Sequence, residues 1–135
     1  MNVSKVMSSN KYKNSKPEIL LRHGLWKIGL RGYRLHYKEI PGTPDITYVS
    51  KKIAIFVNGC FWHRCPYCNY NLPKHNILFW QNKFENNIRR DKDKIKELKK
   101  INWKVITIWE CQIKKNLENC LKEIANLTSA LPTKR

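Results

Sequence analysis

Acidic residues are scarce in this chain of 135 residues. Ten Asp and Glu stand against 27 Lys and Arg, which gives a formal net charge of +17. An imbalance of this size destabilises a compact fold through self-repulsion unless a polyanion offsets it. The charge therefore favours nucleic acid as the partner. Ribosomal or transfer RNA would satisfy it as well as DNA, so the charge alone does not select one of them.

Long apolar runs are also absent. No stretch approaches the ~18–20 residues of a membrane-spanning helix, and no lysine-then-apolar signal segment stands at the start. We therefore expect a cytoplasmic protein without a membrane partner. The length suits one domain and is too short for two. Residues 1–15 are polar and lack apolar periodicity, which predicts a flexible basic arm before a single domain over residues 16–135.

The apolar patterns that remain predict an α/β protein. They indicate helices over residues 17–30, 79–100 and 117–127, strands over 33–37, 45–49, 53–57 and 105–109, and a Pro-Gly turn over 40–44. The short connections between the first three strands favour antiparallel pairing. We expect a mixed central β-sheet flanked by helices.

Cysteine is plentiful, and its spacing indicates a metal site. Three of the five cysteines follow the apolar run 53–57 at CxxxxCxxC spacing, which suits a tetrahedral soft-metal site. A strand ending at Trp109 can bring Cys111 to this loop as a fourth thiolate. His63 is a competing ligand because it lies between Cys60 and Cys65, and unrelated buried thiols are the plainer alternative. Cys120, inside an amphipathic helix, is expected in the core.

Asp45 begins a predicted strand after a Pro-Gly-x-Pro turn, where a carboxylate can hold a divalent metal near solvent. The same residues also make an ordinary turn. Restriction-type nucleases place an acid and then a lysine on the next strand, but residues 53–58 contain neither. The backbone carbonyl of Val57 would have to replace the acid. His63 is the candidate general base in place of the lysine, because neutral imidazole accepts a proton near pH 7.

Large aromatic residues surround this loop. Phe61 and Trp62 leave a predicted strand on opposite sides, so at least one is expected at the surface, and Trp80 precedes the basic helix. Such rings can stack on bases or wedge between them. They can equally be core residues.

These motifs together resemble the very short patch repair (Vsr) endonuclease family. The resemblance covers most of residues 5 to 115 and rests on Gly-Cys-Phe-Trp-His at 59–63, Pro-Gly-Thr-Pro-Asp at 41–45 and Trp-Glu-Cys at 109–111, with further matches at 16–18, 56–58, 79–80 and 87–91. The family has a restriction-endonuclease-like fold. It nicks one DNA strand 5′ to the thymine of a T:G mismatch, which arises when 5-methylcytosine is deaminated.

The resemblance also implies roles for individual residues. It implies catalytic Mg²⁺ bound by Asp45 and the Val57 backbone carbonyl, with His63 as general base and Glu18 and Asp91 as supporting groups. It implies structural Zn²⁺ at Cys60, Cys65, Cys68 and Cys111. It implies that Phe61, Trp62 and Trp80 wedge into the duplex. We expect the protein to be a monomer that associates with the nucleoid. A cytosine methyltransferase is its expected partner system.

Two residues depart from the family pattern. Asn58 stands where histidine is common, so a second imidazole is missing, and Cys65 makes the predicted zinc site all-thiolate. Two other functions remain open from the sequence. One is a zinc-stabilised nucleic-acid-binding module without catalysis, which leaves Asp45, Glu18 and His63 without a role. The other is a restriction-like nuclease with a different substrate.

Overall fold

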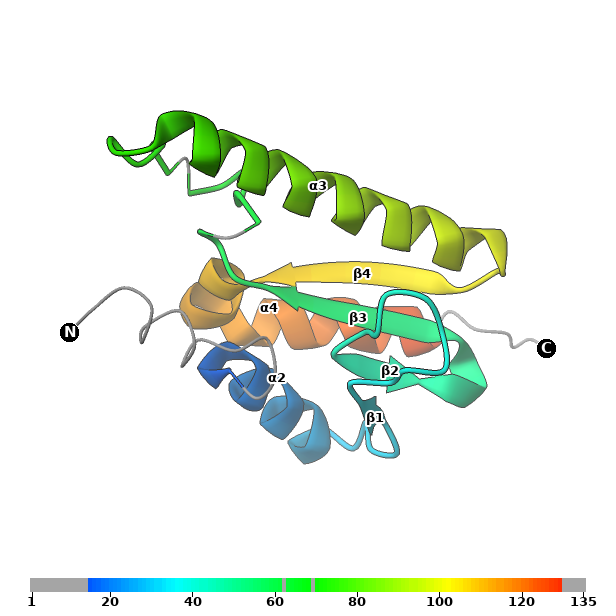
Figure 1. Cartoon of the computed structure of the whole chain (residues 1–135). Helices are drawn as coiled ribbons and strands as arrows, with labels where there is room; N and C mark the ends of the chain where they lie inside the picture. The colour runs from blue at the N-terminus through cyan, green and yellow to red at the C-terminus, as the bar shows by residue number, and fades with distance from the viewer. Residues whose placement is uncertain (1–14, 62, 69, 130–135) are drawn as a thin grey trace.

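The structure is a computed structural model that describes residues 15–61, 63–68 and 70–129. Figure 1 shows three layers: a central sheet, the long helix α3 (Ile77–Lys100) on one face, and α2 (Lys16–Lys27) with α4 (Glu110–Ser129) on the other. The arm predicted over residues 1–15 lies, apart from Ser15, outside the described residues. In the described part of the chain, no helix is both long and apolar enough to cross a membrane.

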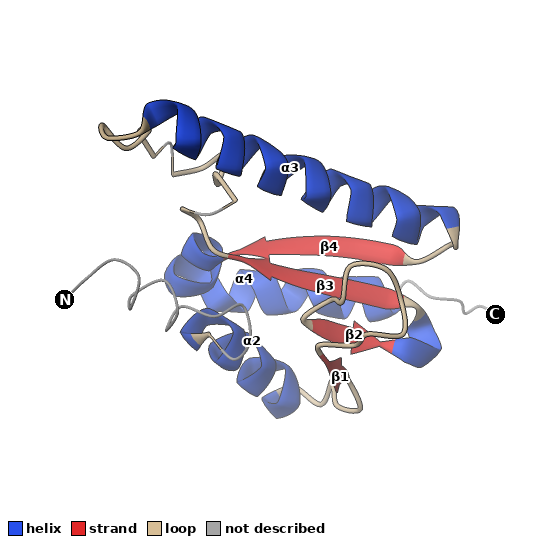
Figure 2. Ribbon diagram, viewed as in Figure 1, coloured by secondary structure: helices blue, strands red, loops and turns tan. Residues whose placement is uncertain are grey.

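The sheet of the described residues has four strands in the order β1-β2-β3-β4 (Figure 2). The strands are Arg34–Leu35, Ile46–Tyr48, Ile53–Asn58 and Lys104–Trp109, and the 3-10 turn η1 (Val49–Lys51) joins the second to the third. β1, β2 and β3 pair antiparallel in chain order, whereas β4 is parallel to β3. The predicted α/β class with a mixed sheet between helices is confirmed.

Strand β3 is apolar from Ile53 to Val57 because both of its faces are covered. Ile53 and Ile55 belong to the core formed with α2 and α4. Ala54 and Phe56 belong to a smaller core with Leu98 of α3. Side chains of a strand point alternately to its two faces, so an apolar run without alternation is what a strand between two helical layers requires.

The start of α2 carries a carboxylate into the interior. The Ser15 hydroxyl accepts a hydrogen bond from the N–H of Glu18 at 3.4 Å, and Pro17 lies in the first turn, where proline is favoured. Gly24 lets α2 approach α4 closely, because a Cβ there would lie 2.9 Å from Leu121. Glu18, in the first turn of α2, is buried with 0% of its surface exposed.

Helix α4 begins earlier than predicted. The sequence pattern indicates a helix from Leu117, but α4 starts at Glu110, directly after β4. The backbone at Asn116 leaves the helical region, with φ −152° and ψ 73°, and its side chain accepts a hydrogen bond from the N–H of Asn119 at 3.1 Å. Asn116 thus caps the second half of α4. The helical spacing of apolar residues starts again after Asn116, so the sequence pattern indicated only the second half of α4.

Strand β1 is shorter than the predicted 33–37. It spans Arg34–Leu35 and ends because His36 adopts a left-handed conformation with φ 49°. Along α3, the apolar residues Phe84 and Leu98 are buried, and Ile88 and Ile95 are half-buried.

Candidate active site and metal-binding cluster

Three segments meet at one edge of the sheet. β3 and β4 are parallel and stay in register to the pair Asn58 and Trp109, so the segments that follow both strands leave at the same edge. β2 is antiparallel to β3 and begins at Ile46 opposite Ile55, which places Asp45 at this edge as well. The topology therefore collects the predicted carboxylate, the histidine loop and the cysteines.

Asp45 is a buried carboxylate held by the end of β3. It is 8% exposed, and its Oδ2 accepts a hydrogen bond from the N–H of Val57 at 2.7 Å. Burial raises the pKa of Asp45 to about 7 although the hydrogen bond from Val57 lowers it, and the nearby Glu18 carboxylate raises it further. A buried carboxylate whose negative charge is compensated mainly by one backbone hydrogen bond is suited to binding a cation.

The carboxylate of Glu18, a residue of α2, lies close to that of Asp45. Its Oε2 lies 2.9 Å from Nη1 of Arg22 and 2.8 Å from Nε2 of His36. One ligand atom each of Glu18, His36 and Asp45 lie within 4.8 Å of one another. The structure thus brings two predicted site residues together and adds His36, which the sequence analysis did not identify.

The imidazole of His63 is oriented by α3. Its Nδ1 lies 2.6 Å from Oδ2 of Asp91, and its backbone N–H donates to the carbonyl of Gly59 at 3.2 Å. A carboxylate beside Nδ1 places the imidazole proton on that nitrogen and leaves Nε2 as a proton acceptor. In this arrangement Nε2 of His63 can accept a proton, and the group of sulfur ligands described below does not include His63.

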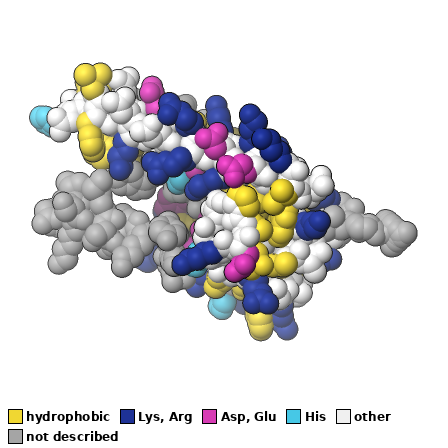
Figure 3. Space-filling view, turned by 45° about the vertical axis from the view of Figure 1, so that its right-hand side comes forward, with side chains coloured by type: hydrophobic (Ala, Val, Ile, Leu, Met, Phe, Trp, Pro, Cys, Tyr) yellow, Lys and Arg dark blue, Asp and Glu magenta, His cyan; other side chains and the backbone are white. Residues whose placement is uncertain are grey.

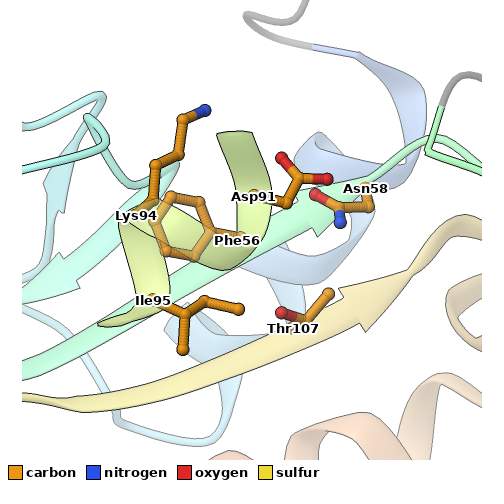
Figure 4. Close-up of a pocket in the computed structure, with 6 residues that line it drawn as sticks. All are labelled: Phe56, Asn58, Asp91, Lys94, Ile95 and Thr107. Atoms are coloured by element: carbon orange, nitrogen blue, oxygen red, sulfur yellow. The ribbon is translucent and has the colours of Figure 1, made fainter. Parts of the chain in front are cut away.

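A cavity of about 370 Å³ lies between Asp45, His63 and Asp91. Its lining comprises Lys38, Gly42, Thr43, Asp45, Phe56, Val57, Asn58, His63, Asp91 and Lys94. Figure 4 shows a smaller recess beside it, where Asp91 and Lys94 of α3 stand near Phe56 and Asn58 of β3. The cavity combines two carboxylates, one imidazole and two ammonium groups, the residue types needed to bind and hydrolyse a phosphodiester.

The two lysines of the cavity were not predicted. Lys94 lies three residues after Asp91, a spacing that puts both on one side of a helix, so this spacing could have indicated it. Gly42 lets the preceding loop pack on Lys94, because a Cβ there would lie 3.0 Å from the Lys94 side chain. In Figure 3, Lys and Arg side chains gather on the visible face over α3.

Four thiols form a compact cluster at the same edge. Cys60, Cys65 and Cys68 come from the loop after β3, Cys111 comes from the first turn of α4, and their sulfurs lie within 4.8 Å of one another. The sulfurs of Cys65 and Cys111 are 3.7 Å apart. Two thiolates bound to one tetrahedral zinc at ~2.3 Å are separated by about 3.8 Å. The cluster therefore fits a metal ion of this kind.

Backbone amides support these sulfurs. The N–H of Tyr67 donates to the sulfur of Cys65 at 3.4 Å, and the N–H of Cys111 donates to that of Cys60 at 3.3 Å. Burial raises the pKa of Cys65, but the Tyr67 N–H and the Cys111 thiol lower it, so that its net pKa lies below the usual value. Cys120 is 1% exposed in the main core and lies outside the cluster, as predicted.

Phe61 belongs to an aromatic cluster beside the N-terminal end of α3. Its ring contacts Tyr70, Trp80 and Phe84 edge to face, with centroid distances of 5.9, 6.1 and 5.3 Å. Phe61 and Trp80 are both half-buried. Trp62, the third predicted wedge residue, lies outside the described residues. The two described rings therefore pack in one aromatic group and remain partly exposed to solvent.

The fold and this edge of the sheet define a class of protein. A mixed sheet between helices, a buried carboxylate at a strand start, and a histidine in the same basic cavity are typical of restriction-endonuclease-like enzymes. A cysteine cluster able to hold a metal accompanies them here.

Comparisons with known proteins identify the family. A family model described as "DNA mismatch endonuclease Vsr" matches residues 1–69. The chain is 40% identical over 108 residues to the type II nicking enzyme V.XorIIP of Xanthomonas oryzae pv. oryzae, covering 80% of this chain and 79% of the relative. It is 39% identical over 121 residues to V.NmeDIP of Neisseria meningitidis serogroup C, covering 89% and 81%. The DNA mismatch endonuclease Vsr of Escherichia coli K12 is 32% identical over 82 residues, which cover 61% and 53%.

The chain therefore belongs to the Vsr family of DNA mismatch endonucleases. Membership makes it a DNA endonuclease and confirms the resemblance inferred from its motifs.

Proposed function

We propose that the chain nicks one DNA strand 5′ to the thymine of a T:G mismatch, by Mg²⁺-dependent hydrolysis in very short patch repair. The observation that supports this most directly is one cavity lined by Asp45, Val57 and His63, in a chain whose relatives are named nicking and mismatch endonucleases. T:G mismatches arise from deaminated 5-methylcytosine, so a cytosine methyltransferase is the expected companion. We expect the enzyme to act as a monomer.

Asp45 and the carbonyl of Val57 would hold the Mg²⁺. A strand residue directs its N–H and C=O to the same side, so the hydrogen bond from the Val57 N–H to Asp45 indicates that the Val57 carbonyl faces this carboxylate too. Two oxygens supplemented by water are the kind of ligand set that Mg²⁺ takes. When bound, the ion would offset charge on the phosphate under attack.

His63 would remove the proton from the attacking water. The Asp91 carboxylate keeps Nδ1 protonated, so the proton is accepted at Nε2, and the same carboxylate stabilises the imidazolium that forms. Lys38 and Lys94 line the cavity and would place positive charge beside the scissile phosphate. Glu18 would support Asp45 from α2.

The aromatic cluster would supply mismatch preference. A mispaired step is easier to unstack than a paired one, so rings that wedge into the duplex favour the mismatch without contacting every base edge. Phe61, Trp62 and Trp80 are the proposed wedge. Zn²⁺ at the four cysteines would hold the loop that carries Phe61 and His63 in place.

A cleavage assay tests this function. Duplexes that contain T:G or C:G at one position, labelled on each strand in turn, are incubated with Mg²⁺. We expect a single nick 5′ to the mismatched thymine and little cleavage of C:G. Asp45→Asn, which keeps the side-chain shape, should bind DNA and retain zinc but not cleave. Equal cleavage of both duplexes would indicate a restriction-like nuclease, and binding without cleavage would indicate a non-catalytic module.

A further inference from the structure

Asp45 also belongs to a second group of buried ligands. Glu18 and His36 do not line the 370 Å³ cavity, yet their ligand atoms and that of Asp45 lie within 4.8 Å of one another. Glu18 is 0% and Asp45 8% exposed, and the His36 side chain is 12% exposed. Such burial is unusual for an ionisable trio in which two members are carboxylates.

His36 is held toward Glu18 without completing a hydrogen bond. Its backbone N–H donates to the carbonyl of Asp45 at 3.0 Å, and its φ of 49° lies in the left-handed region, which is unfavourable for a non-glycine residue. Its Nε2 is buried and lies 2.8 Å from Oε2 of Glu18, but the two groups are not aligned as donor and acceptor. Neighbouring ligands of one octahedral ion, with bonds of about 2.1 Å, lie about 3 Å apart.

The charges of the group also call for a cation. Arg22 pairs with Glu18 at 2.9 Å. Asp45 has no such ion pair among the described residues, although it is 8% exposed and one of its carboxylate oxygens lies within 4.8 Å of a Glu18 carboxylate oxygen. A divalent ion between the three side chains would compensate both carboxylates and would give the His36 Nε2 lone pair a partner.

We propose that Glu18, His36 and Asp45 form a divalent-cation site with one nitrogen ligand. The proposal builds on the proposed function, because Asp45 serves both this site and the catalytic cavity, but the binding itself is measurable without DNA.

The nitrogen ligand sets the preference of the site. Imidazole suits borderline transition ions, whereas Mg²⁺ prefers oxygen, so a Glu-His-Asp set should favour Mn²⁺ over Mg²⁺ more than an all-oxygen site does. The cysteine cluster does not compete for Mn²⁺ because thiolates select softer ions. Mn²⁺ is therefore the probe that separates the two metal-binding regions.

Pulsed electron paramagnetic resonance of bound Mn²⁺ tests the site directly. Zinc-loaded protein is titrated with Mn²⁺ in the absence of DNA, and the echo modulation is recorded on natural protein and on protein with ¹⁵N-labelled histidine. We expect a nitrogen coupling that changes frequency on histidine labelling. This comparison uses the unmodified sequence, so it stands even if a variant fails to fold. Absence of a histidine coupling on bound Mn²⁺, or absence of Mn²⁺ binding, would overturn the proposal.

Substitutions assign the coupling to one histidine. His36→Gln should abolish it and raise the Mn²⁺ Kd at least tenfold, while the Mg²⁺ Kd changes about twofold, because the glutamine oxygen still serves Mg²⁺. His23→Gln, an exposed position on α2, should leave both unchanged. A coupling that survives His36→Gln but disappears in His63→Gln would place the ion in the catalytic cavity instead. Mn²⁺ bound through His36 in a protein that does not nick T:G DNA would leave this site standing and refute the proposed function alone.

Discussion

The cysteine cluster and the Glu18–His36–Asp45 group share one edge of the sheet but are assembled in opposite ways. Three thiols come from one short loop, and backbone N–H groups already point at two of the sulfurs. The carboxylate group instead combines α2, the end of β1 and the start of β2, and burial raises the pKa of Asp45 to about 7. The geometry of the cysteine cluster suits a metal ion that would hold the loop after β3 against α4. The other region buries two carboxylates, of which only Glu18 has an ion pair with an arginine, Arg22, among the described residues.

Loss of one thiol should have the largest effect. Cys65→Ser should lower zinc from one ion per chain toward none and reduce the free energy of unfolding by several kcal/mol, because structural zinc binding of about 10–16 kcal/mol is coupled to folding. Elemental analysis and urea unfolding measure both quantities. Cys120→Ala, which is buried in the core outside the cluster, should keep its zinc. A native protein that is stable without any metal contradicts this contrast.

Substitution in the catalytic cavity should reduce the rate and leave the fold intact. His63→Ala should slow nicking of T:G DNA by about 10²–10⁴-fold, the range for a lost general base, with unchanged zinc content. Single-turnover kinetics give the rate, and His23→Ala at an exposed position is the control. Zinc loss in His63→Ala would make His63 a ligand of the cluster and would merge the two regions.

The buried carboxylate should produce a pH dependence of stability. Asp45 has a pKa of about 7 in the folded protein against an ordinary 3.8, so the folded state binds more protons than the unfolded state between these values. The Asp45 contribution therefore falls as pH rises through 7, by about 1.4 kcal/mol between pH 6 and 8. Urea unfolding of zinc-loaded protein without added Mg²⁺ or Mn²⁺ measures it. Asp45→Asn should remove this fall in the free energy of unfolding. If the variant and the natural protein show the same dependence on pH, the pKa of Asp45 is not raised.

The smallest expected effect concerns the aromatic cluster. Phe61→Leu should weaken binding to T:G duplexes more than to C:G duplexes, by about 0.5–1.5 kcal/mol, since it removes one aromatic partner of Trp80. Arg89→Ala on α3 should weaken both duplexes alike and reduce the salt slope by about one. Salt titrations of both duplexes separate the two outcomes. Equal losses for Phe61→Leu would show that this ring only packs against its neighbours.

The sequence revealed the thiol region better than the carboxylate region. CxxxxCxxC spacing is local, so it predicts a metal site before any fold is known, and only Cys111 needed the parallel pairing of β3 with β4. The strand pattern likewise placed Asp45 at a strand start. His36 gave no such indication, because its position depends on a left-handed φ and on the packing of α2 against β2.

The remaining errors have similar causes. The alternation around Tyr33–Tyr37 predicted a longer strand than Arg34–Leu35, since pattern analysis does not anticipate a residue that leaves the extended conformation. α4 was predicted from Leu117 because Asn116 interrupts the helical period. Both errors hid residues of the site: His36 in one case and the helical setting of Cys111 in the other.

The pairing of Cys60 with Cys111 has a consequence for biosynthesis. These residues are 51 positions apart, and α3 and β4 lie between them. While the chain is being synthesised, Cys60, Cys65 and Cys68 leave the ribosome well before their fourth partner, so the nascent chain presents an incomplete, reactive ligand set. A metal ion bound by all four thiols would therefore have to wait until β4 has paired with β3. Shortage of zinc or oxidation of thiols should therefore harm newly made molecules more than finished ones.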